Sequence, residues 1–366
     1  MLTRVKPGRA VLLAVVIGFG LSASSSAQFV LFPVEGEPGR GPRGVCSGPD
    51  GNIWYTVDNR VGRMTPSGVL TEIELPTPGS GPGDIVAGPD GNLWFLEESA
   101  RRVARVSTAG SITEYPIPAA NAAPREIVVG PDGAIWFSDF IRDSIWRSSL
   151  SGDLAEYPVS TSAYGLAPGS DGNLWFTVFG SVAPIGRMTL SGSVTLFPRP
   201  LGSSFGWRCA RGPDGNVWYT TPRAFGRVTP SGGITQFPLS SDRGHVPADV
   251  AVGPDGNLWM PVDETWFCIP DGCQPPPERD AILRVSISGA QTRYEFAEEF
   301  RIIDGARITA GPAGSMWLTA LRGLVRFFPA ELPGGALSVD VPTIGDAGRI
   351  ALLGLLALVG FALLRR

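Results

Sequence analysis

Gly-Pro-Asp-Gly-Asn-Leu-Trp-Phe at residues 88–95 is one of seven near copies of the same motif in this chain of 366 residues. The successive motif tryptophans are 40, 42, 39, 43, 41 and 58 residues apart. Such a unit has the length of a small four-stranded sheet, which cannot bury its own apolar face. The repeat therefore predicts an all-β fold, a seven-bladed β-propeller with four strands in each blade. The seven tryptophans are Trp54, Trp94, Trp136, Trp175, Trp218, Trp259 and Trp317.

Each repeat divides into four candidate strands, and the fourth carries a proline, as in Ile112 to Pro116. Proline lacks the N–H that a central strand needs, so this strand belongs at the outer edge of its blade. The last repeat has no such strand after Phe328, whereas Phe29 to Pro33 matches the pattern. We therefore predict that the amino-terminal strand completes the seventh blade.

Both ends of the chain are apolar. Basic residues precede an apolar run from Ala10 to Leu21 and a small-residue cleavage site ending at Ala27, which predicts an exported protein. A second apolar run, Ile350 to Leu364, is followed by two arginines and predicts a transmembrane helix that anchors an extracytoplasmic domain in the cell envelope. A buried helix is the alternative, but no second helical segment is predicted for it to pack on. The expected divisions are a signal peptide at 1–27, the propeller at 28–333, a linker at 334–344 and the anchoring tail at 345–366.

The tail has a second possible meaning. Val341-Pro342-Thr343-Ile344-Gly345, an apolar run and a terminal arginine pair resemble the short sorting signals of bacterial envelope proteins that begin Ile-Pro-Thr-Leu. Those signals usually have Ser after the tetrad and a Trp-Gly pair, which are missing here. The resemblance implies that the tail is processed after export.

The residue inventory narrows the chemistry. Without the two terminal segments the chain has 24 basic and 33 acidic residues, a balance that argues against nucleic acid as a partner. Lys6 is the only lysine and His245 the only histidine. These counts exclude Schiff-base lysines, paired-histidine metal sites and catalytic triads other than one through His245. We expect a monomer that binds a peptide, a glycan or another protein and needs no cofactor.

Four cysteines occur in what should be an oxidising compartment. Cys268 and Cys273 flank Ile-Pro-Asp-Gly, a tight turn, and we predict a disulfide between them within the one long insertion, residues 261–280. We predict that Cys46 and Cys209 are buried and unpaired.

The recurring polar residues have a structural interpretation. An Asp-Gly-Asn step lacks the alternating oxygen ligands of a calcium loop, so the motif aspartates are expected to stabilise turns. One arginine in each third strand would point in seven directions around a ring, which favours a structural role over a shared anion site.

Function is expected where the repeats differ. Segments that lead into the first strand and leave the second strand of each blade lie on one face, which we call the irregular face. A mixed acidic and aromatic surface over the central channel is the predicted ligand site. Its predicted ligand-binding residues are Arg43, Asp84, Glu97, Arg125, Glu126, Asp139, Tyr164, Trp207 and Asp249; Asp58, Glu98, Arg208, Asp263, Glu264 and Arg307 belong to the same segments.

The pattern Pro-x-x-Ile-x-x-Gly-Pro-Asp-Gly-Asn-Leu-Trp-Phe, followed by Ile-Gly-Arg-Met-Thr and Ile-Thr-Glu-Tyr-Pro, resembles the repeat of the virginiamycin B lyase, or streptogramin lyase, family of seven-bladed propellers. The resemblance covers roughly residues 28–333. It implies an enzyme that opens a cyclic depsipeptide by magnesium-assisted elimination, with a histidine base where the chain enters an inner strand. The family is also similar to extracytoplasmic propellers that only bind.

The position of that histidine, five residues before the first glycine of each repeat, holds no histidine here. It holds Arg43, Gly83, Arg125, Tyr164, Trp207, Ala248 and Ala306. His245 lies nearby in the sequence, with Asp263 and Glu264 in the adjoining loop, so a displaced base with two carboxylates for Mg²⁺ is one hypothesis. A non-catalytic binding module, with His245 as an ordinary loop residue, is the other.

Overall fold

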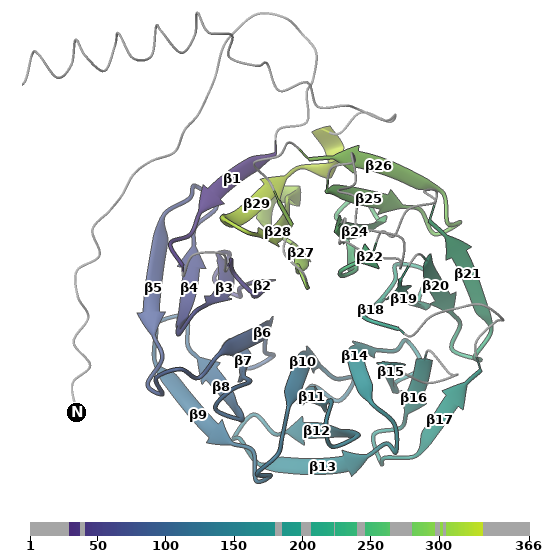
Figure 1. Ribbon diagram of the computed structural model, residues 1–366, viewed down its shortest axis with the longest axis horizontal. Helices are drawn as coiled ribbons and strands as arrows, with labels where there is room; N and C mark the ends of the chain where they lie inside the picture. The colour runs from purple at the N-terminus through teal and green to yellow at the C-terminus, as the bar shows by residue number, and fades with distance from the viewer. Residues whose placement is uncertain are drawn as a thin grey trace, which may run out of the picture.

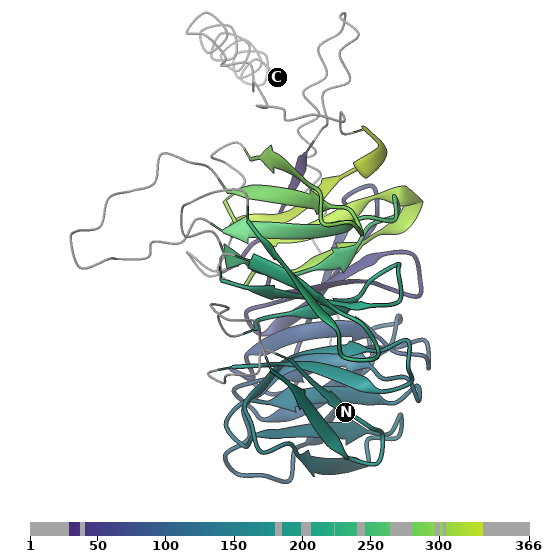
Figure 2. The same cartoon turned by 90° about the vertical axis from the view of Figure 1, so that its right-hand side faces the viewer.

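Seven small antiparallel sheets surround a common axis (Figure 1). The structure is a computed structural model that describes residues 29–36, 41–179, 185–198, 206–222, 224–239, 246–263, 280–296, 301–302 and 305–331. Figure 2 shows the ring nearly edge-on, with its sheets stacked around the axis. The predicted seven-bladed propeller of four-stranded blades is confirmed.

In each blade the chain runs from the axis outward through consecutive strands. Blade 1 contains β2 (Gly44–Ser47), β3 (Ile53–Val57), β4 (Arg60–Met64) and β5 (Leu70–Glu74). Blade 2 contains β6 (Pro82–Ala87), β7 (Leu93–Glu97), β8 (Arg102–Val106) and β9 (Ile112–Pro116). Blade 3 contains β10 (Pro124–Val129), β11 (Ile135–Asp139), β12 (Ser144–Ser148) and β13 (Leu154–Pro158). Blade 4 contains β14 (Ala163–Pro168), β15 (Leu174–Val178), β16 (Ile185–Met188) and β17 (Val194–Phe197).

The remaining blades follow the same plan with two variations. Blade 5 contains β18 (Cys209–Arg211), β19 (Val217–Thr221), β20 (Ala224–Val228) and β21 (Ile234–Pro238). In blade 6 the inner strand is split into β22 (Val246–Pro247) and β23 (Ala251–Val252), followed by β24 (Leu258–Asp263), β25 (Ala281–Val285) and β26 (Gln291–Glu295). Blade 7 contains β27 (Ile308–Ala310), β28 (Met316–Ala320), β29 (Gly323–Phe327) and, from the other end of the chain, β1 (Val30–Pro33).

The closing strand is the one expected from the sequence. β1 pairs antiparallel with β29, with Leu31 opposite Val325 and Pro33 opposite Gly323. The first and last strands of the ring therefore belong to one sheet, and the predicted completion of the seventh blade is confirmed.

The motif tryptophans pack between neighbouring blades. Trp54 of blade 1 lies in one apolar cluster with Ile85 and Phe95 of blade 2 and is completely buried. Trp317 of blade 7 clusters with Val45 and Tyr55 of blade 1, which continues the same packing across the closure. The core is therefore a series of inter-blade layers around the ring.

The repeated turns hold these tryptophans in place. Asp90 accepts hydrogen bonds from Trp94 Nε1 at 3.1 Å and from Asn92 Nδ2 at 2.8 Å. Partial burial raises the pKa of the Asp90 carboxyl, but these hydrogen bonds outweigh it and leave the pKa below its ordinary value. The motif aspartate thus stabilises its turn, as expected, and it also anchors the tryptophan.

The repeated arginines link successive blades on this turn face. The Cζ atom of Arg105 lies 5.6 Å from the Trp94 ring centroid, and its Nη1 donates to the carbonyl oxygen of Leu150 in the next blade at 3.1 Å. Arg326 of blade 7 donates to Pro66 O of blade 1 at 2.7 Å. These contacts give the arginines the structural role that their spacing indicated.

Several predicted segments lie outside the described residues: the signal peptide at 1–27, the tail at 345–366, His245, Glu264, Cys268 and Cys273. Within the described part of the chain, the structure has no helix with the length and apolar character needed to cross a membrane.

Candidate functional site

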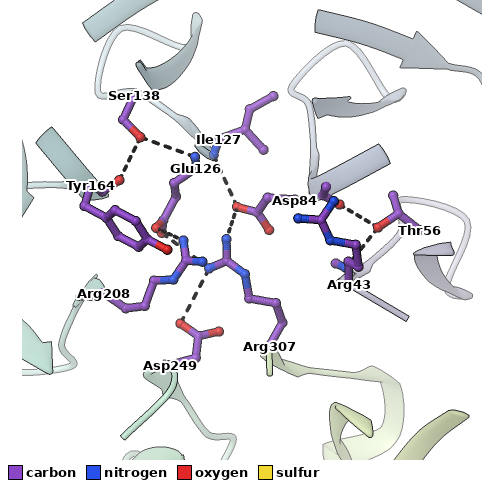
Figure 3. A network of polar contacts seen from close by, with 12 residues as sticks. Arg43, Thr56, Asp84, Glu126, Ile127, Ser138, Tyr164, Arg208, Asp249 and Arg307 are labelled. Atoms are coloured by element: carbon purple, nitrogen blue, oxygen red, sulfur yellow. Dashed lines mark hydrogen bonds and ion pairs between the residues drawn. The ribbon is translucent and has the colours of Figure 1, made fainter. Parts of the chain in front are cut away.

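Residues at or near the start of the inner strands converge on the propeller axis (Figure 3). These residues all come from one repeat position, four residues before the first motif glycine. Equivalent positions of the blades lie at similar distances from the axis, so they form a ring of residues that we call the axial ring. In the seven blades it holds Gly44, Asp84, Glu126, Gly165, Arg208, Asp249 and Arg307.

Two arginines pair with three carboxylates in this ring. Arg307 Nη2 lies 2.9 Å from Asp84 Oδ2, and its Nη1 lies 3.7 Å from Glu126 Oε1 and 3.8 Å from Asp249 Oδ1. Arg208 Nη1 donates to Glu126 Oε2. Each of the five side chains exposes 11% or less of its surface. The axis of the ring is therefore filled by one connected ion-pair network.

Backbone donors fix the axial carboxylates from neighbouring blades. The N–H of Ile127 in blade 3 donates to Asp84 Oδ2 at 3.2 Å, and the N–H of Ile308 in blade 7 donates to Asp249 Oδ2 at 3.0 Å. Burial raises the pKa values of Glu126 and Asp249 above the ordinary range, although the two arginines act in the opposite direction. The carboxyls of Glu126 and Asp249 therefore bind a proton more readily than exposed carboxyls do.

Hydroxyl groups of the second strands position the residues next to the axial ring. Ser138 Oγ donates to the carbonyl oxygen of Tyr164 in the next blade at 2.7 Å, and Thr177 Oγ1 donates to that of Trp207 at 3.0 Å. Thr177 Oγ1 also accepts from Gly165 N at 2.7 Å. The irregular face is thus held by hydrogen bonds within and between blades.

Two arginines and a glutamate form the more exposed layer beside the axial network. Glu98 Oε2 lies 2.8 Å from Arg43 Nη2 and 3.3 Å from Arg125 Nη1. The Arg43 and Arg125 side chains are 47% and 40% exposed, whereas that of Glu98 is 17% exposed. Two cationic groups therefore share one carboxylate at the surface.

Four aromatic rings gather beside them in blades 3 to 5. Tyr164 packs edge-on against Trp207 and Phe140, with ring centroids 5.4 and 6.0 Å apart. Phe179 contacts Phe140 and Trp207 at 5.3 and 5.7 Å. All four rings are partly exposed. We call Phe140, Tyr164, Phe179 and Trp207 the aromatic quartet.

The predicted ligand residues divide into three groups. Arg43, Arg125, Tyr164 and Trp207 lie in the exposed layer, and Asp84, Glu126 and Asp249 lie in the axial network. Glu97 and Asp139 are completely buried at the ends of β7 and β11. Asp263 ends β24, while His245 and Glu264 lie beyond the described residues.

Sequence reasoning placed Arg208 and Arg307 on this face but gave them no role, and it missed Phe140 and Phe179. A comparison of equivalent repeat positions carries the signal for both pairs. The axial position alternates between acids, arginines and glycines, and the residue four places after the motif tryptophan is aromatic in two neighbouring blades.

The axial carboxylates do not fit a magnesium site. Mg²⁺ prefers oxygen ligands, but here the guanidiniums of Arg208 and Arg307 occupy the space between the carboxylates and would repel a cation. Among the residues that the structure describes, no three His, Cys, Asp or Glu side chains gather in a way that could hold a metal ion.

Solved structures of streptogramin B lyase and virginiamycin B lyase resemble this chain along most of its length. A streptogramin B lyase structure is 25% identical with a TM-score of 0.71, covering 82% of this chain and 97% of the other. A selenomethionine-substituted virginiamycin B lyase from Staphylococcus aureus is 26% identical with a TM-score of 0.69, covering 82% and 98%. The same S. aureus enzyme, in a catalytically inactive form with one histidine replaced by alanine, has been solved with quinupristin and matches with a TM-score of 0.69.

The propeller fold also occurs in a different kind of protein. The extracellular domain of a putative hybrid two-component system from B. thetaiotaomicron is 17% identical with a TM-score of 0.65, and the match covers 83% of this chain and 41% of the other. This likeness concerns the fold alone.

A search of curated proteins gives no match. The sequence pattern of the virginiamycin B lyase family matches residues 23–181 and 160–265, which together make up about two thirds of the sequence. The aspartates that anchor the turns and the tryptophans that pack between blades are the residues of the repeat pattern that resembles this family. The chain belongs to the virginiamycin B lyase family.

Proposed function

We propose that this protein is an exported, membrane-tethered propeller that binds a ligand on its irregular face and does not transform it. The observation that carries the proposal is the composition of that face. The position at which the family enzyme has its histidine holds arginine, aromatic or small residues, and two of the aromatic ones, Tyr164 and Trp207, join the quartet. A partly exposed aromatic cluster beside charged groups supports binding, and none of the seven equivalent positions holds the histidine that would act as a base.

The axial network supports the same function. It fills the centre of the ring with ion pairs, so the site on the irregular face has a rigid, charged floor. A preorganised floor reduces the entropy that must be lost when a ligand is bound. The aromatic quartet and the more exposed arginines, Arg43 and Arg125, are then the groups that can contact a ligand.

A streptogramin-type lyase is the alternative function. Family membership favours it, and His245 with Asp263 and Glu264 would supply the base and the magnesium-binding oxygens. When bound, Mg²⁺ would polarise the ester carbonyl of the substrate. The elimination would require His245 to remove a proton from the carbon next to the one that bears the ester oxygen. The bond between that second carbon and the ester oxygen would then break, a carbon–carbon double bond would form and the carboxylate would leave.

Incubation with quinupristin and Mg²⁺ distinguishes the two functions. The purified domain of residues 28–333 contains both ends of the closed ring and is suitable for this assay. We expect mass spectrometry to show intact quinupristin, with no difference between the wild type and His245→Ala. Ring opening that disappears in His245→Ala would overturn the binding-only proposal in favour of the lyase.

The membrane tether is tested separately with the full chain. We expect the protein in the membrane fraction of a bacterial expression host, with the propeller accessible to protease from outside the cytoplasmic membrane. A variant truncated after residue 344 should move to the soluble exported fraction. Recovery of both forms in the soluble fraction would contradict anchoring by the tail.

A further inference from the structure

We infer that the ligand of the irregular face is an aromatic anion, whose ring lies on the aromatic quartet and whose negative group binds the exposed guanidinium N–H groups of Arg43 and Arg125. The inference rests on the proposed binding function and adds the ligand's chemistry. It follows from three features of the face: rings that blade packing does not require, two arginines that share one carboxylate, and a floor whose own carboxylates are already paired.

The quartet is not needed to build the fold. Tyr164 and Trp207 occupy a repeat position that holds glycine or alanine in blades 2, 6 and 7. Phe140 and Phe179 occupy a position that holds Glu98 in blade 2. Because those blades form the same sheets with small or charged residues, the four rings contribute something other than blade packing. Partly exposed rings in mutual contact provide a platform for another ring.

The quartet and the arginine pair are adjacent parts of the same face. Arg125 directly precedes Glu126, whose N–H donates to Ser138 Oγ at 3.3 Å. The same hydroxyl donates to the carbonyl oxygen of Tyr164. One side chain thus connects the backbone next to Arg125 with the residue that carries a quartet ring.

Glu98 shows how an anion would be held. Its Oε2 atom contacts both arginines, so a carboxylate already occupies the space between them. Gly83 leaves room for it, since a Cβ atom on Gly83 would come within 2.3 Å of Glu98 Oε1. One carboxylate shared by two half-exposed guanidiniums leaves cationic hydrogen-bonding capacity for a ligand anion.

The floor of the site leaves no carboxylate unpaired for a cationic ligand. Asp84, Glu126 and Asp249 are paired with Arg208 and Arg307 and are buried. The Cζ atom of Arg208 lies 5.0 Å from the Tyr164 ring centroid, so a cation already occupies one face of this ring. A cationic ligand would meet arginines both beside and beneath the quartet.

Two fluorescent probes separate the contributions of ring and charge. 8-Anilinonaphthalene-1-sulfonate carries aromatic rings and a negative charge, and N-phenyl-1-naphthylamine has similar rings without the charge. We expect the sulfonate to bind the folded 28–333 domain more tightly than the amine, with a difference that shrinks at high salt. Trp207→Ala should weaken both probes, while Leu196→Ala, which alters an exposed residue of an outer strand, should change neither.

Substitutions in the charged layer give effects of opposite sign. Arg43→Gln and Arg125→Gln should each weaken the sulfonate about threefold to fivefold, the range of a partly exposed ion pair, and leave the amine unchanged. Glu98→Gln should strengthen the sulfonate by a similar factor, because it removes the competing internal carboxylate. Near-ultraviolet circular dichroism of each variant verifies that the fold is intact.

The possible failures are distinguishable. Equal affinities for the two probes, or unchanged sulfonate affinity in Glu98→Gln, would show that the ligand need not be an anion. If Trp207→Ala still weakened the binding of both probes, the proposed binding function would stand. Absence of saturable binding by either probe would overturn both the inference and the proposed function.

Discussion

Arg307 in blade 7 forms an ion pair with Asp84 in blade 2, 2.9 Å from Nη2 to Oδ2, and so extends past blade 1. Blade 1 has Gly44 at the axial position, and no side chain stands between the two groups. Arg208 of blade 5 reaches Glu126 of blade 3 in the same way, past Gly165 of blade 4. Both glycines are closely surrounded: a Cβ atom would come within 2.6 Å of Gly83 O at Gly44 and 2.7 Å of Trp207 O at Gly165. These two axial pairs therefore join blades that are not neighbours.

Loss of Arg307 should strongly destabilise the propeller. Arg307→Met would leave Asp84 and Asp249 without their main cationic partner, at a cost of about 3 to 5 kcal/mol in the free energy of unfolding. Urea unfolding of the 28–333 domain at pH 7 measures this loss in the free energy of unfolding. The matched control is Arg125→Met, which removes a half-exposed ion pair and should cost less than about 1 kcal/mol. Equal losses in the two variants would mean that the axial network contributes no more than a surface pair.

The deficit of Arg307→Met should depend on pH. Burial raises the pKa values of Glu126 and Asp249, and the variant lacks a charge that lowers both. A carboxyl whose folded pKa is raised costs stability as pH rises above its unfolded pKa, because the folded form must then bury an ionised group. The difference between variant and wild type should therefore be larger at pH 8 than at pH 5. A pH-independent difference would show that lost packing is responsible.

Glu97→Gln should stabilise the protein at neutral and alkaline pH. Burial first, and then the neighbouring Glu114 carboxyl, raise the pKa of Glu97 to about 7. Its ionisation therefore costs stability that accumulates between its ordinary pKa of 4.5 and about 7. We expect the melting temperature of the variant to exceed that of the wild type at pH 8 by several degrees, with a smaller gap at pH 5. A variant that is less stable at pH 8 would contradict this assignment.

Thiol titration should separate two kinds of cysteine. Cys46 and Cys209 are buried, and burial raises the pKa values of both thiols. With the predicted Cys268–Cys273 disulfide, the folded domain should react with almost no thiol reagent, and two thiols should appear in urea. Reduction before unfolding should raise that number to four. Detection of four thiols in urea without a reductant would contradict the predicted disulfide.

Two tryptophans should separate folding from binding. Trp136 is completely buried between blades, and Trp136→Ala should cost about 3 to 5 kcal/mol in unfolding free energy. Trp207 belongs to the exposed quartet, so Trp207→Ala should weaken ligand capture with a smaller loss of stability. Denaturant unfolding and probe titration of both variants test the contrast. A Trp207→Ala protein as unstable as Trp136→Ala would mean that the quartet is part of the core.

The repeats made the frame predictable from sequence. The position of Trp94 in its repeat, the turn aspartate Asp90 and the edge proline Pro116 each imply a location in a blade, and the missing last strand implied that residues near Phe32 complete the ring. The axial pairs could not be derived in this way. Which carboxylates Arg307 contacts depends on the diameter of the closed ring and on which blades have glycine at the axial position, and neither is a property of one repeat.

The pairing of β1 with β29 has a consequence for biosynthesis. β1 precedes every other strand of the ring in the sequence and its partner β29 follows them all, so the strands of all seven blades must be made before these two sheet edges can be covered. A product interrupted before residue 323 would keep two open edges able to pair with other chains. Completion of the seventh blade, more than progress through individual repeats, thus separates a closed ring from a chain prone to aggregate.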